Sequence, residues 1–250
     1  MRKMQHVVAA TVLASLGSLV ALAQAPAAQA GPVPGPGRGI VVTSGDPPAG
    51  PASFFITSVG KGDGANYGGL AGADAYCAQM ATAGSIPTPP GRTWRAYLSA
   101  TAAAGQPAVN ARDRIGTGPW YNQKGQLIAN NVADLHGDVE RDRNSINNLF
   151  ALNEMGLPVM PNQHDILTGS DSHGRARSSA DDTTCSNYTS NASPPPNIPR
   201  GQGPGVWLGH HDRVGGGNSS WNATHKSVGC SQANLVATGG AGLLYCFAAN

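Results

Sequence analysis

Four cysteines limit what this chain can fold into more than any other feature of its sequence. They are Cys77, Cys185, Cys230 and Cys246. An even number of cysteines in an exported protein indicates two disulfides, and the spacing alone leaves three pairings open. A zinc–thiolate site is the alternative, but the chain lacks the closely spaced C-x-x-C pair typical of such sites. Each disulfide would add roughly 3–5 kcal/mol of stability on the chain-entropy account.

The first 30 residues have the pattern of a secretory signal peptide. Arg2 and Lys3 provide a positive start, an apolar run follows over residues 7–23, and residues 28–30 (AQA) form a small-x-small cleavage site. The apolar run is shorter than a transmembrane anchor requires, and no later segment is apolar enough to span a bilayer. We therefore expect cleavage near Ala30 and a secreted or periplasmic mature protein.

The composition favours a fold with much irregular structure. Glycine and proline make up about a fifth of the chain, against about 12% in average proteins, and charged residues make up only 12%. Helical bundles and coiled coils are excluded because they need abundant Leu, Glu and Lys. The 40% of hydrophobic residues and the small net charge argue against disorder. Since no basic run occurs, nucleic acid is not an expected partner.

Residues 31–52 read as a Pro/Gly-rich linker, and residues 53–250 read as one mixed α+β domain. A helix is expected over residues 71–83, where Ala73, Cys77 and Met80 share one face at helical spacing. Expected strands cover residues 54–59, 94–99, 126–129, 165–169, 206–209 and 242–247. Residues 119–122 are expected to form a turn. Residues 170–184 and 192–205 read as long loops, and residues 134–163 as an insertion without periodicity.

Several segments occur in an order that resembles the endostatin domain of collagens, a variant of the C-type lectin-like fold. They are residues 69–77 (GLAGADAYC), 93–99 (TWRAYLS), 109–113 (VNARD), 168–175 (TGSDSHGR) and the apolar end 243–247, together with the order of the cysteines. Residues 128–135 also look like part of bacterial secreted lectin-like domains of unassigned function. The resemblance covers residues 54–248. It implies an α+β, endostatin-like domain with long loops and the disulfides Cys77–Cys246 and Cys185–Cys230.

The resemblance does not settle the function, which has to be argued from the site. The leading hypothesis is an exported, non-enzymatic recognition domain that binds carbohydrate. The alternative is a protein-binding module of the cell envelope or extracellular matrix. C-type lectins hold calcium with an E-P-N or Q-P-D motif before one cysteine and W-N-D before the next. Here Asp181 and Asp182 precede Cys185 without such a proline motif, and the segment Trp221-Asn222-Ala223 lacks the aspartate. Calcium is thus the cofactor to consider, but its usual lectin site is incomplete.

The loops over residues 170–230 are expected to bind the ligand, because their Asn, Ser, Thr and Trp residues offer hydrogen bonds and a stacking face. Trp207 lies in an apolar run and is expected in the core, whereas Trp221 lies among polar residues and is expected to contact ligand. The predicted ligand-binding residues are Asp181, Asp182, Asn187, Asp212, Trp221 and Asn222.

A transition-metal site is a further possibility. His210, His211 and His225 offer three imidazoles, which suit zinc, and an open coordination position would make the protein a metal-dependent hydrolase. Neighbouring residues of a strand point to opposite faces, so both His210 and His211 could bind one ion only from a loop. The zinc ligands of endostatin lie near the start of that domain, where the matching region here lacks histidine.

Two other patterns point to no definite site. Alternating polar residues surround Gly137 and resemble a calcium loop, but their spacing also fits a solvated polar loop; they are Asp134, His136, Asp138, Glu140 and Asp142. Neither G-x-S-x-G nor H-E-x-x-H occurs. The run of Ser, Asp and His within residues 170–173 is not expected to form a catalytic triad, because immediate neighbours on one turn rarely converge. We therefore expect a protein that is not an enzyme.

Overall fold

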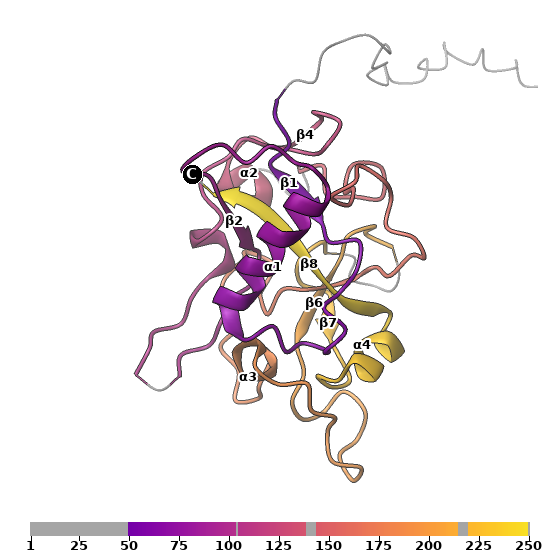
Figure 1. Cartoon of the computed structure of the whole chain (residues 1–250). Coiled ribbons are helices and arrows are strands. Elements are labelled where there is room, and N and C mark those ends of the chain that lie inside the picture. Colours follow the sequence, from indigo (N-terminus) through magenta and orange to yellow (C-terminus); the bar gives the residue numbers. More distant parts are fainter. Residues whose placement is uncertain (1–49, 104, 139–143, 215–219, 250) are drawn as a thin grey trace, which may run out of the picture. The chain divides into compact units, whose positions relative to one another are not determined.

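The last strand of the chain, β8 (Gly240–Ala249), is the centre of the fold (Figure 1). All ten of its residues are buried, and their side chains alternate between two apolar clusters. Leu244 and Cys246 belong to one cluster, while Leu243 and Tyr245 belong to the other. A strand that is buried on both faces needs apolar side chains at successive positions, which explains the continuous apolar run near the end of the sequence.

The computed structural model describes residues 50–103, 105–138, 144–214 and 220–249, which form a mixed α+β domain. The expected signal peptide and most of the expected linker lie outside the described residues. The helices are α1 (Gly69–Ala83), α2 (Val132–His136), α3 (Cys185–Tyr188) and α4 (Gln232–Thr238), with a 3-10 turn over Ala111–Asp113. None of the helices in these ranges is long and apolar enough to cross a membrane.

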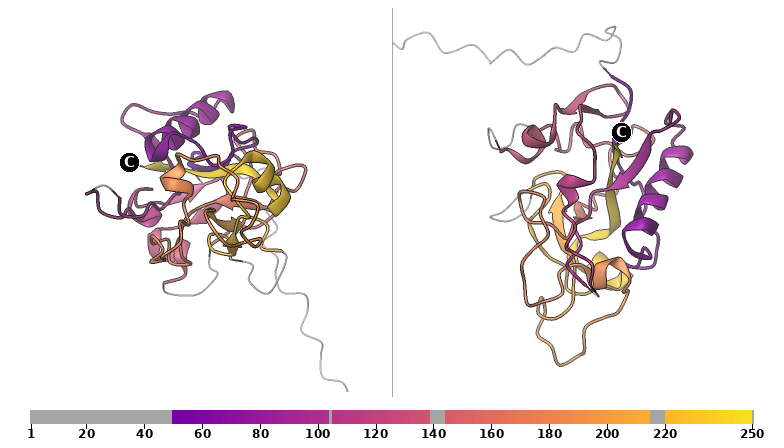
Figure 2. Two further views of the ribbon diagram at one scale, coloured as in Figure 1. Left: turned by 90° about the horizontal axis from the view of Figure 1, so that it is seen from below. Right: turned by 90° about the vertical axis from the view of Figure 1, so that its left-hand side faces the viewer.

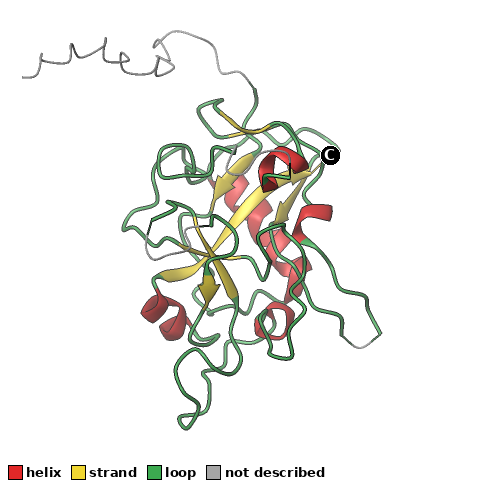
Figure 3. Ribbon diagram, turned by 180° about the vertical axis from the view of Figure 1, so that it is seen from behind, coloured by secondary structure: helices red, strands yellow, loops and turns green. Residues whose placement is uncertain are grey.

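The main sheet has the strand order β1-β8-β5-β6-β7, and β2 also pairs with β8. Its strands besides β8 are β1 (Phe54–Ile56), β2 (Thr93–Ala96), β5 (Asp165–Leu167), β6 (Trp207–His210) and β7 (His225–Lys226). Only β5 runs parallel to β8, and the other pairings are antiparallel. A separate hairpin joins β3 (Trp120–Tyr121) to β4 (Leu127–Ala129), and long loops link most elements (Figure 3).

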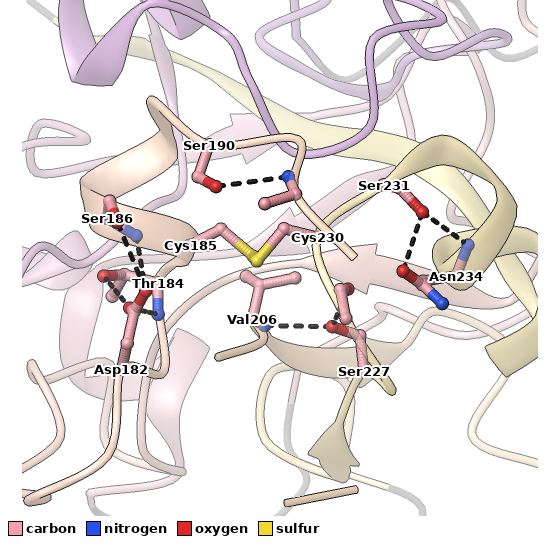
Figure 4. Close-up of a disulfide and its surroundings, with 12 residues drawn as sticks. Asp182, Thr184, Cys185, Ser186, Ser190, Val206, Ser227, Cys230, Ser231 and Asn234 are labelled. Atoms are coloured by element: carbon pink, nitrogen blue, oxygen red, sulfur yellow. Dashed lines mark hydrogen bonds between the residues drawn. A yellow bond between two sulfur atoms is a disulfide. The ribbon is translucent and has the colours of Figure 1, made fainter. Parts of the chain in front are cut away.

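Helix α1 lies on one face of the sheet (Figure 2) and packs its buried side, including Cys77 and Met80, into the cluster that contains Leu244. A disulfide joins Cys77 to Cys246 and so links this helix to the central strand. The second disulfide joins Cys185 to Cys230 and connects α3 to the segment before α4 (Figure 4). These are the two pairs that the resemblance to endostatin implies.

The predicted elements agree with the structure where apolar runs are long, and they differ where elements are short. Helix α1 and strands β1, β2, β4, β5, β6 and β8 lie within or close to their predicted ranges. The turn expected over residues 119–122 is instead β3, paired with β4. Helix α2 (Val132–His136) extends into residues 134–163, the segment whose sequence lacks periodicity. Its start is set by Asn131, whose side chain accepts a hydrogen bond from the Asp134 amide, and not by apolar periodicity.

Candidate metal centre

Trp221, predicted to stack on a ligand, lies in the core. It is only 4% exposed, and its ring packs against Tyr97 and Tyr245 with centroid distances of 4.8 and 5.3 Å. The expectation of an exposed stacking face is therefore wrong. The reason is a close approach that the sequence does not reveal. A Cβ at Gly209 would lie 1.9 Å from the Trp221 carbonyl oxygen, so glycine allows this polar segment to pass directly against β6.

Asn222 is also buried, and its amide group is occupied by internal hydrogen bonds. Its Nδ2 donates to the Tyr97 hydroxyl at 2.9 Å. The Tyr97 hydroxyl lies 2.7 Å from Nε2 of His136, and the other ring nitrogen of His136 lies 2.7 Å from the Val132 carbonyl oxygen. Since the carbonyl can only accept, His136 carries its proton on Nδ1 and accepts from Tyr97. Burial lowers the pKa of His136 to about 4, and Arg112 adds to this effect.

The protein is expected to lose about 3 kcal/mol of stability through His136 as the pH falls from 7 to 4. The unfolded chain takes up a proton near the ordinary pKa of 6.5, while the folded protein does so only near 4. Between these values the unfolded state binds more protons, so falling pH favours unfolding. Urea unfolding at pH 7, 5.5 and 4 measures how the free energy of unfolding changes with pH. If the His136→Gln variant showed the same change, His136 would not be its cause.

The other predicted ligand contacts of this loop region stabilise turns. Asp182 accepts hydrogen bonds from the amides of Thr184 and Ser186, next to the Cys185–Cys230 disulfide (Figure 4). Asn187 accepts from the Thr101 amide at 2.9 Å. Both side chains also lie within hydrogen-bond distance of the Thr184 hydroxyl, at 3.1 and 3.0 Å, so the structure brings them together around this turn.

Two further residues of this region lie at its surface. Asp181 is exposed, 3.6 Å from the ammonium group of Lys226. Trp207 is half-buried beneath the Arg177 guanidinium, 3.6 Å from the ring centroid, and so is less buried than the sequence predicts. Arg177 thus covers one face of this ring.

One set of chemically reactive side chains does come together, at the edge of the sheet formed by β5, β6 and β7. Asp165 lies directly opposite His210 in the β5–β6 pairing. His225 lies opposite Leu208, two residues from His210 along β6. Cross-strand partners and residues two apart on a strand share a face of the sheet. The sheet register therefore places Asp165, His210 and His225 on one face.

The donor atoms of these three residues have the spacing of metal ligands. The His210 Nε2 atom lies 3.0 Å from Asp165 Oδ1 and 3.0 Å from His225 Nε2. The His225 Nε2 atom lies 3.5 Å from the same carboxylate oxygen. Ligand atoms about 2.0–2.1 Å from a tetrahedral zinc ion are about 3.3–3.4 Å apart. The three atoms thus nearly form one triangular face of such a tetrahedron.

The Asp165 carboxylate is buried beside the imidazole rings of His164, His210 and His225. Its side chain is 1% exposed, and neither oxygen accepts a hydrogen bond from a residue that the structure describes. The His210 ring approaches closely but without the alignment of a hydrogen bond. Burial acts to lower the pKa of His210, yet Asp165 outweighs it, so the pKa is raised. A proton on His210 or a bound cation would each compensate the carboxylate.

Hydrogen-bond acceptors and carboxylates lie near the Nδ1 atoms of His210 and His164, on the side of each ring away from the Asp165 carboxylate. The Nδ1 atom of His210 lies 2.9 Å from the Val214 carbonyl oxygen, which can only accept, so Nδ1 carries a proton and Nε2 is the nitrogen that could bind an ion. Asp212, predicted as a ligand contact, instead lies 3.4 Å from Nδ1 of His164, the residue before Asp165. Asp212 also accepts a hydrogen bond from Asn162 at 2.8 Å. Outer acceptors of this kind are typical of histidines that bind metals.

His211, predicted as a metal ligand, takes no part in this set. It follows His210 directly, and neighbouring residues in extended chain point to opposite sides. His211 is buried, and burial lowers its pKa to about 4. His164 and Asp165 belong to the cluster instead. An aspartate that opens an otherwise apolar strand directly after a histidine was the signal in the sequence that could have identified them.

The alternating polar residues around Gly137 form no calcium loop in the part of the chain that the structure describes. Asp134 and His136 lie within α2, and Asp134 accepts a hydrogen bond from the Asn130 amide. Asp138 forms an ion pair with Arg112. Glu140 and Asp142 lie outside the described residues. The other three side chains have separate partners, since His136 lies against the Tyr97 hydroxyl, and they do not surround a common point.

No family model matches the sequence, and no curated protein matches it either.

Proposed function

We propose that this chain is an exported recognition domain that binds a divalent transition-metal ion, zinc above all, through Asp165, His210 and His225. The observation that carries the proposal is the buried Asp165 carboxylate, which faces two imidazole nitrogens within 3.5 Å and accepts no hydrogen bond from a described residue. Imidazole nitrogens suit zinc, whereas calcium prefers six to eight oxygen ligands. Two histidines and one carboxylate also suit iron(II), so elemental analysis decides the native metal.

Export and the endostatin-like, C-type lectin-like fold are parts of the same proposal. Two disulfides support an oxidising compartment, because thiols stay reduced in the cytosol. The order of motifs in the sequence supports the fold, and so does the pairing that links α1 to the C-terminal strand. Recognition is the role that this fold implies, with a glycan or an envelope or matrix protein as partner. The proposed metal centre replaces the incomplete calcium site of the lectins.

The protein purified with both disulfides intact is expected to contain about one zinc or iron ion per chain by elemental analysis. After treatment with a chelator, added zinc at about a hundred times its Kd should stabilise the fold by about 2.7 kcal/mol. For a domain of this size, that raises the thermal midpoint by about 5–10 °C. Calcium at the same concentration is the control and should produce no comparable shift. A protein that neither contains nor binds a transition metal would overturn the proposal.

The same preparation tests whether the partner is a glycan or a protein. A glycan array is probed with the zinc-loaded protein and again in the presence of chelator, and three outcomes are distinguished. Binding that is lost with chelator supports recognition of a glycan through the metal. Binding in both conditions supports a glycan site elsewhere in the loops. If no glycan binds, a pull-down from the native cell envelope tests the protein partner.

A further inference from the structure

The proposed ligands Asp165 and His210 lie where the pairing between β5 and β6 ends. Asp165 is the first residue of β5 and His210 is the last residue of β6, and they form the terminal pair of this register. Past this pair, the His211 amide donates to the His164 carbonyl oxygen at 3.2 Å. Paired segments open most readily at their ends, so the positions of both ligands depend on the contacts made just beyond the strands.

Asp212 joins the two segments that lie beyond these strand ends. Its side chain is 5% exposed. Its Oδ1 atom accepts a hydrogen bond from the Val214 amide at 3.0 Å, and its Oδ2 atom accepts one from the side-chain amide of Asn162 at 2.8 Å. The Oδ2 atom also lies 3.4 Å from Nδ1 of His164. One buried carboxylate thus holds the turn that follows β6 against the segment that precedes β5.

Both sets of contacts lead to the ring of His210. The Val214 carbonyl oxygen lies 2.9 Å from Nδ1 of His210, and because a carbonyl only accepts, this contact keeps a proton on Nδ1. The ring of His164 stacks on the ring of His210 with a centroid distance of 4.1 Å and an interplanar angle of 12°. The His210 imidazole is therefore held at one edge and on one face, in the orientation that places its Nε2 atom 3.0 Å from each of the two other donor atoms.

We propose that Asp212 is the positioning residue of this metal centre. Through Val214 it fixes which nitrogen of His210 carries the proton, and through His164 it fixes the plane of the ring. Outer partners that orient a metal-binding imidazole raise the affinity for the ion, and their removal typically costs 10- to 100-fold. This inference rests on the proposed metal site. It assigns to Asp212 a role in the affinity of that site and not a place among the ligands.

Competition with a chromophoric chelator measures the zinc affinity of the variants that test this role. The Asp212→Ala variant removes both sets of contacts and should bind zinc about 10- to 100-fold more weakly, with unchanged stoichiometry. The Asn162→Ala variant keeps the charge of Asp212 but removes one of its hydrogen bonds, so a loss of about two- to tenfold is expected. The control is Asp171→Ala, because Asp171 accepts hydrogen bonds from the amides of His173 and Arg175 in a different turn. This change should leave the zinc affinity unaltered.

A second measurement reports on the His210 ring when each protein is saturated with zinc, so that differences in affinity no longer matter. The Nδ1 proton of His210 faces the Val214 carbonyl oxygen and should give a slowly exchanging NMR signal in the unmodified protein. The signal should be the same in Asp171→Ala and should exchange faster with water in Asp212→Ala. A role of Asp212 through its charge alone would not change this exchange.

The two measurements separate the inference from the metal site itself. Zinc affinity that is unchanged in Asp212→Ala would overturn the inference while the metal site stands. A loss in Asp212→Ala without any loss in Asn162→Ala and without faster proton exchange would show that only the charge acts, and would overturn it as well. If Asp212→Ala does not fold, the affinity of Asn162→Ala decides, because that variant keeps the carboxylate. Failure of the unmodified protein to bind zinc would refute the metal site.

Discussion

Replacing Asp165 by asparagine is expected to lower the affinity for zinc by at least about 100-fold, more than the 10- to 100-fold typical of changes to residues behind the ligands. The variant keeps the shape of the side chain but removes the negative charge that faces both imidazole nitrogens. Competition with a chromophoric chelator measures the affinity of the unmodified protein and of the variant. The His210→Gln variant should show a loss of similar size, because His210 lies 3.0 Å from both other donor atoms.

The stability of the metal-free Asp165→Asn variant distinguishes a metal site from a structural ion pair. Without metal at pH 8, the Asp165→Asn variant should be at least as stable as the unmodified protein, because it removes a buried carboxylate that no described residue hydrogen-bonds. A clear fall in its thermal midpoint would show that Asp165 serves the fold instead. The His173→Ala variant is the matched control and should change neither affinity nor stability. Loss of zinc binding in that control would contradict the location of the site.

The second large effect concerns the disulfide between Cys77 and Cys246. Replacing both cysteines by alanine is expected to lower the free energy of unfolding by about 5 kcal/mol, since this bond closes a loop with a sequence separation of 169. Replacing Cys185 and Cys230 should cost about 4 kcal/mol, because their separation is 45. Urea unfolding of the three proteins measures the difference. The reverse order, or a loss below about 2 kcal/mol for the first pair, would contradict the expectation.

The position of this bond explains why its removal should affect the whole domain. Cys246 lies in the middle of β8, opposite Phe55 of β1 and Ala96 of β2, and Cys77 lies on the buried side of α1. The bond therefore joins the principal helix to the strand that both apolar clusters share. Removing the bond increases the conformational freedom of the unfolded chain between elements that are far apart in the sequence.

Features that depend on neighbours along the chain could be read from the sequence. The apolar run at residues 242–247 predicted a buried strand, and the spacing of Ala73, Cys77 and Met80 predicted the buried face of α1. Both patterns are local, because strand and helix periodicity decide which residues share a face. The even number of cysteines predicted two disulfides, and the resemblance to endostatin supplied their pairing.

The candidate site depended on the tertiary structure. The sequence identified His210 and His225, but Asp165 joins them only because β5 pairs with β6 in one particular register. Trp221 lies among polar residues in the sequence, yet the close approach of its backbone to Gly209 places it in the core. Composition and periodicity describe single segments, whereas pairing between strand residues 17 and 45 positions apart determines which side chains meet. The sequence therefore indicated the long apolar elements, whereas the pairing of β5, β6 and β7 brings Asp165 to His210 and His225.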